Sequence, residues 1–245
     1  MFLYERNKKF VGTFGNNPSD PADFVIEKDG DKIVMTIGDK VIEGNCATRI
    51  SSPEELKDAL TTSTKPNIAL VGDTSVVKQI SVEHDCTLNL NDKKITFENS
   101  ESDVPISCDK GTLTVRDGVL DATTAKPSLV PINAWGGTLI LDNVTVYSNT
   151  KSESCVFCNS GEVIIKSGRY INKNTGIYEY AGGAPLVLNV KNGSGGKITC
   201  YGGFFAGRDP ALGDDADGGT FVAEGYESVP AIVDGYKGFI VKKKS

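Results

Sequence analysis

Two carboxylates, Asp92 and Asp117, occupy the same place in two similar segments, TLNLNDKKIT (87–96) and TLTVRDGVLD (112–121). If these segments lie on neighbouring strands, the two side chains stack about 4.8 Å apart. A retaining glycosidase holds its two carboxyl groups about 5 Å apart, so the pair is a candidate for glycoside hydrolysis. The place is also a corner between strands, where Asp is expected for turn reasons. We favour the turn interpretation.

A second candidate combination lies one position earlier in the same pattern. Arg116, Asp142 and Lys166 would align on successive strands, with Asn91 and Tyr201 at the two ends. A polysaccharide lyase needs a base to remove a proton and a cation to stabilise the developing negative charge. Alternating charges on an outer face also form a structural ion ladder, and we favour that interpretation.

Both candidates depend on a repeat that recurs through the middle of the chain. Its leading apolar residues are spaced by 25, 26, 24 and 35 residues: Leu88, Leu113, Leu139, Val163 and Ile198. Two further apolar positions follow, two and seven residues later, around a polar or glycine corner. A later apolar stretch recurs as well, as in VPISC (104–108) and VPINA (130–134). Each period therefore predicts three short parallel strands and no helix, a unit that buries its inner face only when stacked.

This pattern resembles the right-handed parallel β-helix, or pectin-lyase-like, superfamily. The segment SSPEELKDAL (51–60) predicts a helix with Ser52 as N-cap, Pro53 at the first position and Glu55 at the third. The resemblance implies that this helix caps the first coil of an all-β solenoid of about five to six coils. It also implies a closing segment within GGFFAGRDPALG and FVAEGYESV. The scaffold carries enzymes, adhesins and virion parts alike, so the resemblance specifies fold more than activity.

The predicted organisation has three parts. Residues 1–50 form an N-terminal arm and a small β-meander that serves as an attachment module, because DFVIEKDGDKIVMTIGDKVIEG alternates apolar and polar residues around turn signals. Residues 51–206 form the capped parallel β-helix. Residues 207–245 form a C-terminal loop and a closing β segment.

Composition and charge exclude several classes of function. The formal net charge is −6 and no basic stripe is present, so we expect no nucleic-acid partner. No apolar run is long enough to span a membrane, and MFLYERNKKF has no secretory h-region. The cysteines, including the Cys155-x-x-Cys158 pair, are predicted as reduced core residues rather than metal ligands or redox groups. We expect no metal and no cofactor.

Aromatic residues in predicted corners are candidates for stacking on sugar rings. They are Trp135, Tyr147, Tyr178 and Tyr180. Single exposed aromatics are also common without a ligand.

An apolar strip on the outside of the predicted solenoid indicates an assembly. Ile140 and Ile164 follow inward-facing residues and therefore face outward, flanked by Thr114 and Thr199. Such a strip requires cover, and partner subunits around a threefold axis would supply it.

These features together favour a non-enzymatic structural protein of a bacteriophage virion. We expect a head fibre, capsid decoration or short tail spike, a homotrimer that meets other virion proteins through its N-terminal region and contacts host-surface glycans. One alternative is a polysaccharide lyase or glycoside hydrolase acting through Asp92, Asp117, Arg116, Asp142 and Lys166. Another is a bacterial glycan-binding surface module.

Overall fold

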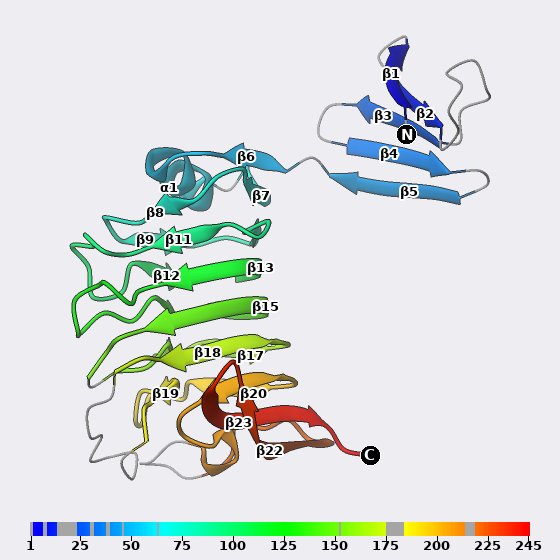
Figure 1. Ribbon diagram of the computed structural model, residues 1–245. Helices are drawn as coiled ribbons and strands as arrows, with labels where there is room; N and C mark the ends of the chain where they lie inside the picture. Colours follow the sequence, from blue (N-terminus) through cyan, green and yellow to red (C-terminus); the bar gives the residue numbers. More distant parts are fainter. Residues whose placement is uncertain are drawn as a thin grey trace. The chain divides into compact units, whose positions relative to one another are not determined.

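The computed structural model describes residues 2–6, 9–13, 24–29, 32–37, 40–45, 47–62, 64–151, 153–174, 184–213 and 219–245. The chain divides into two compact units, Met1–Thr48 and Arg49–Ser245. Both consist mainly of β-strands, as Figure 1 shows.

The first unit is an antiparallel sheet in which each strand pairs with the next one along the chain. Its strands are β1 (Phe2–Arg6), β2 (Lys9–Thr13), β3 (Phe24–Asp29), β4 (Lys32–Ile37) and β5 (Lys40–Asn45). Strands β3 to β5 lie where the alternation predicts a meander. The segment predicted as an N-terminal arm contributes β1 and β2, whose aromatic and β-branched residues favour strand pairing.

The second unit is built from parallel strands that recur once per repeat in three rows. Row A contains β7 (Asn67–Leu70), β10 (Cys86–Asn89), the first parts of β13 (Thr112–Asp121) and β15 (Thr138–Ser148), β17 (Glu162–Ile165) and β20 (Lys197–Cys200). Row B contains β8 (Thr74–Ser75), β11 (Lys94–Thr96), the remainders of β13 and β15, β18 (Gly168–Asn172) and β21 (Gly203–Ala206). Row C contains β9 (Ile80–Val82), β12 (Ile106–Cys108), β14 (Ile132–Ala134), β16 (Val156–Cys158) and β19 (Leu188–Val190).

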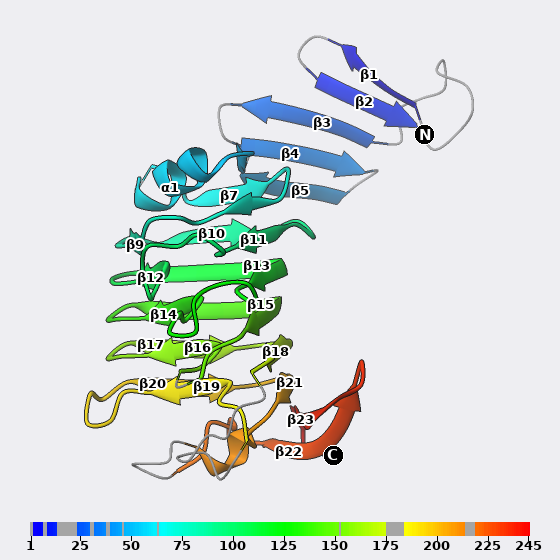
Figure 2. The ribbon, with the colours of Figure 1, turned by 60° about the vertical axis from the view of Figure 1, so that its left-hand side comes forward.

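The pairing within these rows confirms a mainly β chain with largely parallel sheets. Strands of rows A and C each pair with the equivalent strand of the next repeat, and Figure 2 shows them stacked one below another. This arrangement is consistent with a β-helix-like solenoid.

The predicted register is confirmed from β13 onward. It is wrong for β10, the strand that precedes β13 in row A. Leu113 pairs with Leu139, which pairs with Val163. Leu88, however, pairs with Val115 rather than with Leu113, whose partner is Cys86. The alternation has a period of two, so a shift of two residues keeps the same side chains inward and leaves no trace in the apolar pattern.

The inward side chains of the three rows form one hydrophobic core. Leu88, Leu139 and Ile165 are among its fully buried members. Near the last repeats the rings of Tyr170 and Phe205 stack with centroids 5.1 Å apart. Among the described residues, the interior between the three rows is therefore filled by side chains.

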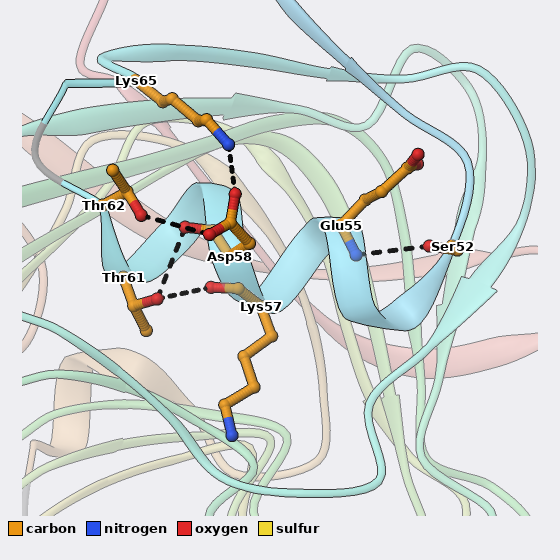
Figure 3. Close-up of polar contacts among 7 residues, drawn as sticks. All are labelled: Ser52, Glu55, Lys57, Asp58, Thr61, Thr62 and Lys65. Carbon is orange, nitrogen blue, oxygen red and sulfur yellow. Dashed lines mark hydrogen bonds and ion pairs between the residues drawn. The ribbon is translucent and has the colours of Figure 1, made fainter.

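A single α-helix within the described residues, α1 (Pro53–Thr61), covers the beginning of the stack. Ser52 is its N-cap, and the Ser52 Oγ accepts a hydrogen bond from the Glu55 N–H at 3.2 Å (Figure 3). The Glu55 carboxylate accepts from the Ser51 N–H at 2.8 Å. At the other end, Asp58 contacts Thr62 and Lys65 (Figure 3). The predicted helix and its cap are confirmed, and the helix buries Leu56, Ala59 and Leu60.

The C-terminal residues close the other end of the stack. Strands β22 (Tyr226–Val233) and β23 (Tyr236–Lys243) form a hairpin, and β23 pairs antiparallel with β21. In row A, Val222 forms a bridge with Cys200, below the last complete strand. A short 3-10 helix, η2 (Pro210–Leu212), lies between β21 and this closing segment. The antiparallel strand stops further parallel pairing at this edge.

Candidate functional site

The corner between rows A and B holds the predicted carboxylate pair. Asp92 and Asp117 both have positive φ angles, 59° and 58°, and Asn143 follows with 54°. Such angles favour Asp, Asn and Gly, because few other residues tolerate the left-handed region. The Asp117 Oδ1 accepts a hydrogen bond from the Asn143 Nδ2 at 3.0 Å, and its Oδ2 lies 3.7 Å from the Arg116 Nε. These contacts give the Asp117 carboxylate a role in forming the corner.

The predicted charged column lies on the outer face of row A, with Asn89 in the place predicted for Asn91. Arg116 pairs with Asp142, and Lys166 and Tyr201 directly follow β17 and β20, the next two strands of row A. Asn89, rather than Asn91, precedes Arg116, because Leu90 and Asn91 are additional residues at the corner. Asp142 accepts a hydrogen bond from the Ser167 hydroxyl at 2.7 Å. The aligned charges are those a lyase would need, but the contacts of Asp142 are those of a corner.

The described cysteine thiols lie in the core. Cys86, Cys108, Cys155, Cys158 and Cys200 are all buried and unpaired. Burial raises the pKa of Cys155 to about 12 and that of Cys108 to about 11, so these thiols stay protonated and unreactive at neutral pH. In the parts of the chain that the structure describes, no three His, Cys, Asp or Glu side chains come together as a metal site.

The two predicted sugar-stacking residues that the structure describes, Trp135 and Tyr147, do not lie together. Trp135 is 53% exposed and lies just before β15, whereas Tyr147 lies near the opposite end of that strand. Tyr147 is half-buried, with the Lys173 ammonium 4.2 Å from its ring centroid. Tyr178 and Tyr180 lie outside the described residues. Trp135 and Tyr147 therefore do not form one site.

The predicted outer strip is a continuous column on row A. Thr114 pairs with Ile140, Ile140 with Ile164, and Ile164 with Thr199. Each is half-buried, and each lies between buried neighbours on its own strand. Neither isoleucine belongs to a hydrophobic cluster of the described residues. The column is thus a β-branched strip on the outside of a parallel sheet.

An aromatic pair near the C-terminal end was missed from the sequence. Tyr201 is 44% exposed, and its ring meets that of Tyr226 edge-on, with centroids 5.4 Å apart. Tyr226 lines a groove of about 410 Å³ beside the closing segment. The two tyrosines are 25 positions apart in the chain, but Tyr201 follows the parallel strand β20 and Tyr226 begins an antiparallel hairpin, so no periodic signal links them.

Comparison with known proteins adds no relative: no protein-family model, no curated protein and no solved structure matches the chain. Among the described residues, no helix is long and apolar enough to cross a membrane.

Proposed function

We propose that the second unit is a right-handed parallel β-helix of about five to six coils, and that it is the assembly module of a non-enzymatic virion protein. In this proposal the protein is a homotrimer in a bacteriophage particle, as a head fibre, capsid decoration or short tail spike. The strands of rows A, B and C, with their shared register, support the solenoid. The sequence resemblance supports the bacteriophage assignment.

The outer strip is the observation that carries the assembly role. Ile140 and Ile164 are adjacent across a parallel pair, so their side chains form one apolar surface with the methyl groups of Thr114 and Thr199. Apolar surface of this kind is stabilised when another molecule covers it. Three copies that meet through the strip would bury it around a threefold axis.

The closed ends of the second unit fit this role. Helix α1 covers the first repeat, and the β22–β23 hairpin covers the last strand of row B. A stack capped at both ends presents its side faces for contact and does not extend into a fibre by strand pairing. The antiparallel sheet of the first unit would then serve for attachment to other virion proteins.

The predicted catalytic residues lend the enzyme alternative no specific support. Asp117 holds a corner through Asn143, and Asp142 is bound by Ser167. We therefore expect no release of reducing ends or unsaturated sugars from bacterial polysaccharides, measured by reducing-end assay and absorbance at the wavelength of the unsaturated product. Release that is lost in Asp142→Asn would contradict the proposal.

The assembly role is tested by placing charge on the strip. Changing Ile140 and Ile164 together to Asp should convert the trimer to a monomer, because two carboxylates per subunit would be buried at the interface. The matched control is Val71→Asp with Val77→Asp, since these valines are exposed in loops of the same unit. Light scattering should show a trimer for the control and a monomer for the strip variant. A strip variant that remains trimeric would overturn the proposal.

A further inference from the structure

The corner between β19 and β20 is longer than the corners that join rows C and A before it. Residues 135–137 and 159–161 form this corner in the two preceding repeats, whereas residues 191–196 form it here. The additional length carries the chain outward, beyond the earlier corners (Figure 2). A Cβ added at Gly193 or Gly195 would meet no described atom within 4 Å. The middle of this corner therefore lies in solvent, away from the stack.

A hydrogen-bonded turn forms the tip of this corner. The Lys191 N–H donates to the Cys158 carbonyl oxygen at 2.8 Å, which ties the start of the corner to the preceding repeat. The Ser194 N–H donates to the Lys191 carbonyl oxygen at 3.2 Å and closes the turn. Asn192 and Gly193 are the central residues of the turn. Both are exposed, and Gly193 has a φ of 66°.

The Gly193 backbone nitrogen is free to react with the side chain that precedes it. Asn192-Gly193 is the single Asn-Gly dipeptide of the sequence. Among the residues that the structure describes, neither the Gly193 N–H nor the Asn192 carboxamide has a hydrogen-bond partner. Glycine has no Cβ to shield its nitrogen, and its backbone adopts more conformations than that of other residues. The nitrogen can therefore approach the Asn192 Cγ.

We propose that Asn192 is a site of spontaneous deamidation, which converts it to aspartate and isoaspartate. The Gly193 nitrogen loses its proton and attacks the Asn192 Cγ, so the N–Cγ bond forms and the Cγ–Nδ2 bond breaks. The departing NH2 group takes up that proton and leaves as ammonia. Water then opens the cyclic imide at either of its carbonyl groups, which gives aspartate or isoaspartate. One water is consumed and one ammonia is released, and the chain gains a negative charge at neutral pH.

An asparagine at the same corner of the preceding repeat shows what prevents the reaction. Asn159 is 7% exposed, and the N–H of the next residue, Ser160, donates to the Trp135 carbonyl oxygen at 3.1 Å. Attack by this nitrogen would break that hydrogen bond and would require a packed side chain to rotate. Asn159 should therefore persist while Asn192 reacts.

This inference goes beyond the proposed assembly role and does not depend on it. The turn is built within one chain, so a monomer would contain it unchanged. The new carboxylate forms in solvent, and we expect the stack to remain folded after the reaction.

The test follows the mass of each asparagine-containing peptide of the full chain. Samples are incubated at pH 6 and pH 8, digested with pepsin in acid to stop the reaction, and mapped by mass spectrometry. The peptide that contains Asn192 should gain about 1 Da, and faster at pH 8, because the attacking nitrogen must lose its proton. Enzymatic methylation of isoaspartyl carboxyl groups should label the same peptide. A synthetic peptide of residues 191–196 sets the timescale, and an Asn192 that is unchanged in the protein when this peptide has fully reacted would overturn the inference.

Two variants make the outcome specific to the turn. Ser160→Gly places the same Asn-Gly dipeptide at the packed corner, where Asn159 should react about tenfold or more slowly than Asn192 of the same molecule. After unfolding in urea the two rates should become similar. Gly193→Ala adds a Cβ beside the attacking nitrogen and should slow the reaction of Asn192 by about tenfold or more. Equal rates at Asn159 and Asn192 in a Ser160→Gly variant that circular dichroism shows to be folded would contradict the inference, as would an undiminished rate in Gly193→Ala.

Discussion

Glu153 and Asp103 show how neighbouring carboxylates acquire different properties in the loops before row C. Glu153 is half-buried, and burial raises its pKa, with a smaller contribution from the negative charge of Asp103. The pKa of Asp103 is lowered, first by the hydroxyl of Ser128 at 2.6 Å and then by the ammonium of Lys126 at 3.0 Å. The first carboxylate favours its protonated form in the folded protein and the second favours its ionised form.

The two carboxylates predict opposite effects of pH on stability. The raised pKa of Glu153 means that its contribution to folding is lost as pH rises through that pKa. Glu153→Gln should therefore increase the free energy of unfolding at pH 7, and the increase should vanish near pH 4. Asp103→Asn should decrease the free energy of unfolding at pH 7. The lowered pKa of Asp103 stabilises the folded protein at pH values above the pKa that this carboxyl has in the unfolded chain. Urea unfolding at both pH values checks this, and a less stable Glu153→Gln at pH 7 would contradict it.

Individual residues also show what could be predicted from sequence and what could not. The inward and outward assignments of Leu139 and Ile140 follow from alternation and are confirmed by burial. The two additional residues Leu90 and Asn91 were not predicted, because a corner can absorb two residues without changing which side chains face inward. The ring contact between Tyr201 and Tyr226 was missed because it depends on the antiparallel return of the hairpin.

At the scale of the elements, glycines at the start of row B strands allow neighbouring strands to approach. Gly168 has φ of 115°, and a Cβ there would lie 2.2 Å from the Val144 carbonyl oxygen. Gly193, in the loop after β19, also has positive φ but has no neighbour within 4 Å of such a Cβ. The first position combines a steric conflict with backbone strain, whereas the second has the strain alone.

Gly168→Ala should therefore destabilise the protein more than Gly193→Ala. We expect a loss of about 2–4 kcal/mol at Gly168 and about 1 kcal/mol at Gly193. Urea unfolding followed by circular dichroism gives both free energies. Equal losses at the two positions would show that row B does not pack as closely as the structure indicates.

Element boundaries were predictable where local chemistry marks them. Helix α1 has an N-cap serine, a proline at its first position and an acidic third residue, and all three act as expected. The strands of row C were predictable from the second apolar stretch of each repeat. The pairing of β23 with β21 was not, because its antiparallel direction breaks the repeat that identifies the other strands.

At the scale of the whole molecule, the strip on row A connects the fold to the proposed function. In a solenoid, the same position of successive repeats lies in one straight column. Side chains of one type at that position therefore form a continuous surface. Thr87, Thr114, Ile140, Ile164 and Thr199 form such a column. The column is β-branched throughout, and its centre is apolar. This is where we place the subunit contact.

The most direct test is the native mass of the purified full-length chain by light scattering, with an SDS gel of the unheated sample. One chain has a mass of 26.1 kDa, so three chains give 78.3 kDa. Our account predicts the larger mass and a band that resists SDS at room temperature. A single species of 26.1 kDa at micromolar concentration would contradict the assembly role and leave the strip without a partner.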